Sequence, residues 1–165
     1  MISDLNADIA YIATPYAFNE EQALLCLQHV KPVLCEKPMT LTYRQTSHLT
    51  DVATKQNLFL MEAMWTGCTP FINGIKEIIA EGTIGKVRHV QADFGFASPF
   101  DADSRLYNYA LGGGSVMDIG IYPLFLATLL LGKSQNIQVA ATLSPTQVDE
   151  MPLFSFNMAM EVPHS

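Results

Sequence analysis

Basic residues are scarce in this chain of 165 residues. It has nine lysines and arginines against sixteen acidic residues, so its net charge is −7. No cluster of lysine and arginine stands out, and such clusters are what attract polyanions. We therefore expect neither nucleic acid nor an anionic membrane as a partner.

Other features are missing as well. The three cysteines show no CxxC spacing, which favours free thiols in a reducing cytoplasm over disulfides. The four histidines share no ligand spacing, so we expect no metal. The opening MISDLNADIA does not resemble a signal peptide. The longest apolar run, 119–132, is shorter than the ~20 residues that span a bilayer. These absences favour a soluble, cytoplasmic protein.

About half of the residues, 49%, are hydrophobic, and only 15% are charged, which suits a globular protein. Apolar runs at 9–13, 33–35 and 58–63 are typical of buried strands. Helices are predicted between them, over 20–30 with Asn19 as N-cap and from the capping-box pair Thr42 and Gln45 to residue 56. This alternation predicts a parallel sheet with right-handed crossovers.

The pattern changes after Trp65. Thr69 and Pro70 predict the start of a helix that ends before Gly82. Alternation over 86–96 predicts a half-buried strand, and a helix over 115–131 and strands over 137–143 and 153–160 follow. We expect an α/β protein with two domains: part of a Rossmann domain over 1–65, then part of an α+β domain over 66–165 with an open, mostly antiparallel sheet.

Polar residues stand where the three predicted strands end. The segments are Thr14-Pro15, Glu36-Lys37-Pro38 and Met64-Trp65. Ligands bind beyond the carboxyl ends of parallel strands, so these residues should line one crevice. Lys37 is a candidate hydrogen-bond donor or proton relay there. The alternative is a surface lysine on a turn that ends in proline.

A second candidate set lies in GGGSVMDIGIYP, residues 112–123. Asp118 and Tyr122 are four residues apart, so on a helix they share a face. The three glycines before them permit close backbone approach, and Pro123 disturbs helical hydrogen bonding. The alternative is a flexible loop, a polar helix face and a core tyrosine.

Together these strings resemble the Gfo/Idh/MocA oxidoreductases. The matching stretches are DIAYIATP, KPVLCEKP, LFLMEAMW, EGTIGKVRHVQADFGF and GGGSVMDIGIYP, in family order over nearly the whole chain. The resemblance implies a dehydrogenase that transfers hydride between NAD or NADP and the CH–OH group of a sugar, polyol or diol. It also implies a homo-oligomer formed through the sheet of the second domain.

Site residues follow from the same resemblance. It implies that Tyr122 is the general acid/base, that Lys37 eases loss of the phenol proton or holds the substrate hydroxyl, and that Asp118 orients that pair. It places Thr14, Pro15, Glu36, Lys37, Pro38 and Trp65 at the cofactor. The Lys37–Pro38 bond is expected to be cis.

Two features depart from the family pattern. No GxGxxG turn occurs in the sequence, so the opening βαβ unit is expected to be missing, and the chain is expected to stop partway through the second sheet. Gly67 stands where related sequences usually carry arginine. Two alternatives therefore remain open: a truncated, non-catalytic remnant that persists as a dimeric or partner-bound fold, and a sugar-binding module without redox chemistry.

Overall fold

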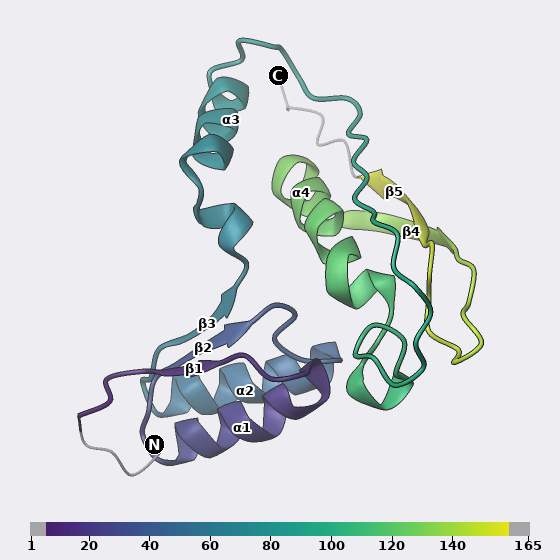
Figure 1. Cartoon of the computed structure of the whole chain (residues 1–165). Coiled ribbons are helices and arrows are strands. Elements are labelled where there is room, and N and C mark those ends of the chain that lie inside the picture. The colour runs from purple at the N-terminus through teal and green to yellow at the C-terminus, as the bar shows by residue number, and fades with distance from the viewer. Residues whose placement is uncertain (1–5, 159–165) are drawn as a thin grey trace.

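The computed structural model describes residues 6–158. Its first part is a parallel sheet of β1 (Ala10–Ile12), β2 (Val33–Glu36) and β3 (Leu60–Ala63) in that order. Helices α1 (Tyr16–Gln28) and α2 (Tyr43–Lys55) connect the strands and lie on the same face of the sheet (Figure 1). The predicted parallel βαβαβ arrangement is confirmed.

The core of this part lies between the sheet and the two helices. Alternate strand residues face it, and the register places Ala10 beside Val33 and Val33 beside Leu60. The fully buried members of this cluster include Leu27 and Leu49, one from each helix. On the opposite face Tyr11 and Met61 remain 54% and 37% exposed. The three strands are therefore half-buried, with their covered face toward α1 and α2.

The predicted start of α1 was wrong. The helix begins at Tyr16 directly after Pro15, whose ring fixes φ near the value that a helix needs (−56°). Asn19 is therefore inside the helix and fully buried. Its amide is satisfied by remote groups, because Thr14 Oγ1 donates to Asn19 Oδ1 and Asn19 Nδ2 donates to the carbonyl of Pro38. Asn19 joins two strand ends instead of capping a helix.

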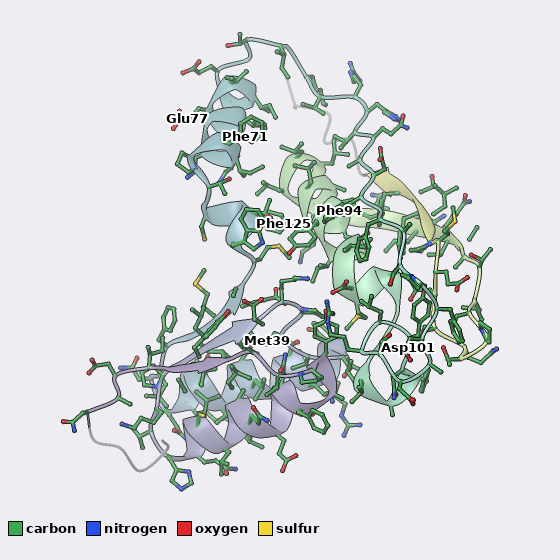
Figure 2. The ribbon with its side chains drawn as sticks, viewed as in Figure 1. Met39, Phe71, Glu77, Phe94, Asp101 and Phe125 are labelled. Atoms are coloured by element: carbon green, nitrogen blue, oxygen red, sulfur yellow. The ribbon has the colours of Figure 1, made fainter. Side chains whose placement is uncertain are left out.

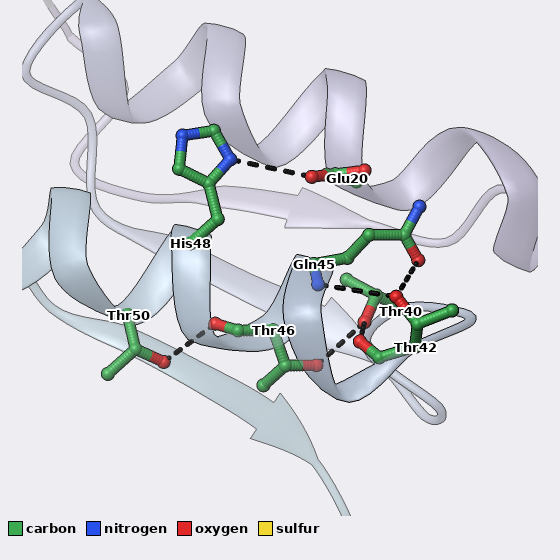
Figure 3. Close-up of polar contacts among 7 residues, drawn as sticks. All are labelled: Glu20, Thr40, Thr42, Gln45, Thr46, His48 and Thr50. Atoms are coloured by element: carbon green, nitrogen blue, oxygen red, sulfur yellow. Dashed lines mark hydrogen bonds and ion pairs between the residues drawn. The ribbon is translucent and has the colours of Figure 1, made fainter.

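Helix α2 begins as predicted. Thr42 Oγ1 accepts a hydrogen bond from the backbone N–H of Gln45, and the Gln45 side chain turns back to Thr42 (Figure 3). Within the same turn, Thr40 and Thr46 share a hydrogen bond. One turn further on, His48 lies 3.4 Å from Glu20 of α1. These contacts satisfy the free donors at the start of the helix and hold it against α1.

The second part begins with a 3₁₀ turn, η1 (Trp65–Cys68), and helix α3 (Pro70–Ala80). Thr69 caps α3 through the N–H of Ile72, and Pro70 is its first residue, as predicted. The strand predicted over 86–96 was wrong. This segment forms no ladder with any strand among residues 6–158. Its alternating side chains were a valid local signal, but a strand also needs a neighbour whose backbone groups it can pair with.

The glycine-led segment forms a helix that starts irregularly. One turn of π-helix, η3 (Val116–Gly120), continues into α4 (Ile121–Leu131). The strands β4 (Ser134–Ala140) and β5 (Leu153–Met158) then pair antiparallel beside α4 (Figure 1). The first of these was predicted three residues too late. Residues 159–160 of the second prediction lie outside the described residues.

The longest apolar helical run is Tyr109–Leu131. By length and composition alone it could cross a membrane, with a mean hydropathy of 1.7. A left-handed turn at Gly112 interrupts it, and it contains the buried carboxylate of Asp118, to which Arg105 and Tyr16 donate hydrogen bonds. The polar contacts of Asp118 are unusual for a membrane span, and 17% of the run is buried inside the structure.

The glycines before this helix lie where an added side chain would collide with neighbouring atoms. A Cβ at Gly113 would lie 2.8–3.0 Å from three backbone oxygens, those of Leu106, Asn108 and Arg105. We expect Gly113→Ala to destabilise the chain by about 2 kcal/mol, because backbone atoms move less easily than side chains. Gly74→Ala in α3 is the matched control. Nothing lies within 4 Å of its added Cβ, so that change should stabilise by about 0.5–1 kcal/mol. Thermal unfolding measures both, and equal melting temperatures would contradict the prediction.

Candidate active site

Lys37, Asp118 and Tyr122 meet where the sheet adjoins the glycine-led helix. Lys37 follows the end of β2, and its Nζ donates a hydrogen bond to the backbone carbonyl of Asp118 at 2.6 Å. The same Nζ lies 4.8 Å from the centre of the Tyr122 ring. An ammonium over an aromatic face is attracted by the electrons of the ring. Residues more than eighty positions apart therefore share one location.

The carbonyl that receives Lys37 lies in the π-turn. Asp118 is a residue of η3, and the residue five positions later, the π-helical partner of its carbonyl, is Pro123, which has no N–H. The ammonium of Lys37 is a donor to this carbonyl. Lys37 is therefore held by the main chain of residue 118 and not by its carboxylate.

The carboxylate of Asp118 has other partners. Tyr16 Oη and Arg105 Nη1 each donate to Asp118 Oδ1 at 2.7 Å, and Arg105 Nη1 also donates to Tyr16 Oη at 3.1 Å. Burial alone would raise the pKa of Asp118. The hydrogen bonds from Arg105 and Tyr16, with the charges of Arg105 and Lys37, outweigh it and hold the pKa below its ordinary value. Burial, followed by the hydrogen bond to Asp118 and the charge of that carboxylate, raises the pKa of Tyr16, and Arg105 offsets part of this rise.

Tyr122 is surrounded by aromatic side chains. Trp65 Nε1 donates to Tyr122 Oη at 3.2 Å, and the two rings meet edge to face. Phe94, labelled in Figure 2, approaches the Tyr122 ring in the same manner, with centroids 5.6 Å apart. Next to Trp65, Gly67 packs under Phe125 of α4, and a Cβ there would lie 2.7 Å from that ring. The phenol oxygen thus has one polar partner within an apolar surround.

The other residues predicted at the cofactor lie at the strand ends. Thr14 and Pro15 follow β1, and Thr14 is linked to Pro38 through Asn19. The Lys37–Pro38 bond is cis, as expected. The Glu36 carboxylate accepts hydrogen bonds from Tyr11 Oη and from the backbone N–H of Lys37. Their contact with a cofactor stays a prediction.

A cavity of about 900 Å³ lies next to this site. It is enclosed by residues 89–98, the start of the glycine-led helix, and β5, and it is mostly apolar. Asp118 and Phe94 line it, whereas Lys37 and Tyr122 do not. Because the Lys37 and Tyr122 side chains do not line it, we place the candidate site at the junction and not in this cavity. Among residues 6–158 no cluster of His, Cys, Asp and Glu side chains could hold a metal.

Sequence reasoning missed three residues of this arrangement: Tyr16, Asn19 and Arg105. Tyr16 directly follows Thr14-Pro15, so its place beside the crevice could have been inferred from that position. Arg105 lies in a loop without a motif, and nothing in its neighbours predicts that it reaches Asp118. Asn19 was interpreted as a cap because asparagine is favoured at helix N-caps, and the sequence does not show whether its amide bonds locally or to distant groups.

Two family models match the two parts of this chain. Residues 72–162 match the GFO/IDH/MocA C-terminal domain, and residues 1–64 match the oxidoreductase family with an NAD-binding Rossmann fold. The chain belongs to the Gfo/Idh/MocA family of oxidoreductases. The division predicted at residues 65 and 66 stays a prediction.

Three relatives of this family member are informative. It is 34% identical over 152 residues to mouse trans-1,2-dihydrobenzene-1,2-diol dehydrogenase, covering 91% of this chain and 45% of that protein. It is 40% identical over 132 residues to D-xylose 1-dehydrogenase (NADP(+)) of Hypocrea jecorina, covering 75% and 34%. The aldose-aldose oxidoreductase of Caulobacter crescentus, solved with glycerol, matches with a TM-score of 0.84 at 28% identity, covering 93% and 48%. The chain spans less than half the length of each relative.

The residues at the junction fit one half of the family's NAD(P) cofactor. The Lys37 ammonium, the Tyr122 phenol and the Trp65 ring supply a hydrogen-bond donor, a hydroxyl group and an aromatic surface, which by their chemistry suit a nicotinamide and an alcohol. For the pyrophosphate, the usual cradle is a glycine-rich turn at a helix N-terminus. No such string occurs in the 165 residues. The residues at the junction therefore fit the nicotinamide end of the cofactor, and no string in the sequence fits its pyrophosphate.

The carboxylate of Asp118 should make stability depend on pH. Its folded pKa is below the ordinary 3.8, so its contribution is fully present above that pH and is lost as pH falls through the folded pKa. The difference in free energy of unfolding between the wild type and Asp118→Asn should be constant near neutral pH and should shrink in acid. Urea unfolding at a series of pH values measures this difference. A difference that grows on acidification would contradict the assignment.

Proposed function

We propose that this chain acts in an NAD(P)-dependent dehydrogenase that oxidises the CH–OH group of a sugar, polyol or diol. The observation that carries the proposal is the position of the Lys37 ammonium, 2.6 Å from the Asp118 carbonyl and 4.8 Å from the Tyr122 ring. The dehydrogenase relatives support the reaction class. Because the chain spans less than half the length of each relative, its substrate and activity are proposals and are not taken over from those relatives.

In this reaction Tyr122 Oη removes the proton of the substrate hydroxyl. The bound nicotinamide supplies the hydride acceptor. Hydride leaves an alcohol carbon only as the O–H proton is taken, so the base must lie beside the hydroxyl. Lys37 is held by the Asp118 carbonyl, where its ammonium stabilises the oxygen charge that develops. The Trp65 N–H keeps Tyr122 Oη in place. In the reverse direction Tyr122 returns the proton.

The proposal is tested by titrating the purified chain with NADPH and NADH while nicotinamide fluorescence is recorded. A saturable signal, followed by reduction of NADP in the presence of D-xylose or trans-1,2-dihydrobenzene-1,2-diol, is the expected result. No saturable signal at millimolar cofactor would refute cofactor binding by this chain. Tyr43→Phe, a change at an 89% exposed position, serves as the control for variant preparation.

A second candidate is a non-catalytic fold that persists through contact with another copy, with the second sheet as its contact surface. The observation that favours it is the lack of a GxGxxG string in the sequence. Cofactor titration separates the two candidates. Sedimentation analysis of the same sample would show a dimer for this second candidate and, together with absent cofactor binding, would favour it.

A further inference from the structure

We propose that Tyr16 and Arg105 are positioning residues for Tyr122, acting through the carboxylate of Asp118. This inference rests on the proposed function, since Tyr122 is the proton-transfer group there. Tyr16 is the first residue of α1, and Arg105 lies in the loop before the glycine triplet. Both donate to the same atom, Asp118 Oδ1, at 2.7 Å. The contact joins the end of β1 to the start of the glycine-led helix.

The strength of this contact comes from burial and charge. The Asp118 side chain is only 10% exposed, whereas that of Arg105 is 54% exposed. A buried carboxylate that accepts two hydrogen bonds, one from a guanidinium, is held more strongly than a neutral pair would be. Gly112 adds close packing, since a Cβ there would lie 3.5 Å from Tyr16 Cβ and 2.4 Å from Leu41 Cδ2. The helix start therefore lies directly against the first part of the chain.

Asp118 is held at two points that come from different strands. Its carboxylate is bound by Tyr16, which follows β1, and its carbonyl is bound by Lys37, which follows β2. One bond alone would let the helix rotate about residue 118. Two bonds to two fixed points prevent that rotation, and Tyr122 lies one helical turn further on. The pair formed by Tyr16 and Arg105 therefore sets where the Tyr122 phenol stands relative to Lys37.

Trp65 offers a direct readout of this placement. It is the single tryptophan of the chain, and its Nε1 donates to Tyr122 Oη. Trp65 is already 61% exposed, so displacement of Tyr122 should act mainly by removing the acceptor of its Nε1 and the edge-to-face ring contact. Emission wavelength and acrylamide quenching of Trp65 therefore report the position of Tyr122 without cofactor, substrate or turnover. Failure of the proposed enzyme activity would leave this measurement unaffected.

The experiment compares Tyr16→Phe, Arg105→Gln and the control Tyr43→Phe. Tyr43 is the first residue of α2, as Tyr16 is of α1, and it is 89% exposed. Loss of one charge-assisted hydrogen bond weakens an arrangement by about tenfold or more. We expect a small red shift and a modest rise in quenching of Trp65 in the first two variants, with unchanged far-UV ellipticity, and a wild-type signal in Tyr43→Phe.

Wild-type emission and quenching in both Tyr16→Phe and Arg105→Gln would overturn the proposal. If Arg105→Gln loses ellipticity, Asp118→Asn replaces it, because that change removes the acceptor charge and keeps the carbonyl for Lys37. Combining Tyr16→Phe with Asp118→Asn should then add little to the effect of either change alone, since both act through one contact. Fully additive shifts of Trp65 emission would contradict the inference that Tyr16 and Asp118 act on Tyr122 through one contact.

Discussion

Replacing Tyr122 by phenylalanine should lower turnover by about 10³-fold, within the range for loss of a general acid/base. The ring remains, so its edge-to-face contacts with Trp65 and Phe94 and the position of Lys37 above its face are kept. Only the oxygen that we propose as the acceptor of the substrate proton is lost. Steady-state kinetics with NADP and either D-xylose or trans-1,2-dihydrobenzene-1,2-diol measure the effect. The affinity for the cofactor should change little.

The matched control for this change is Tyr107→Phe. Tyr107 also carries a hydroxyl in a hydrogen bond, to the carbonyl of Ser98, and its ring also packs against a phenylalanine, Phe100. Its loss should leave turnover within about twofold of the wild type, because the residue is outside the junction. Near-normal turnover in Tyr122→Phe would contradict the proposed role of the Tyr122 phenol in proton transfer.

Replacing Lys37 by methionine is expected to have the second-largest effect. The change keeps an unbranched chain but removes the ammonium that lies 2.6 Å from the Asp118 carbonyl. Turnover should fall by about 10²-fold or more, because charge that develops on the substrate oxygen loses its nearest cation. Asp118→Asn should cost only about tenfold by comparison, because the carbonyl that holds Lys37 belongs to the main chain and survives.

Kinetic constants of both variants test this ordering. A carboxylate that directly held the ammonium would make Asp118→Asn as damaging as Lys37→Met. Equal losses in the two variants would therefore contradict the main-chain role of residue 118. The double variant should lose more turnover than Lys37→Met alone, since the carboxylate contacts with Tyr16 and Arg105 are separate from the carbonyl contact of Lys37.

The first part of the fold could be predicted from sequence because its signals are local. Apolar runs mark β1, β2 and β3, and Thr42 caps α2 through the residue three positions later. The start of α3 in the second part was predictable for the same reason, from Thr69 and Ile72. Asn19 was misassigned because its partners, Thr14 and Pro38, are brought to it by the sheet. The segment 86–96 was misassigned because pairing depends on a second strand, which alternation within one segment does not reveal.

The candidate site could be predicted only in outline. The strand-end position of Lys37 and the spacing of Asp118 and Tyr122 indicated convergence, and the structure places all three together. The atom that Lys37 contacts is a main-chain carbonyl in a π-turn, and no local pattern specified that turn. The partners of the Asp118 carboxylate come from distant segments, so only folding brings them within reach.

The central claim is that the Lys37 amine and the Tyr122 phenol stand together in solution. Magnetic resonance of the chain with isotope-labelled lysine side chains tests it most directly, because protons above an aromatic face are shielded by the ring. The Lys37 methylene signals, assigned with Lys37→Arg, should lie upfield of those of the other lysines and should return to their range in Tyr122→Leu. Lys37 signals that coincide with the other lysines in the wild type would contradict the account.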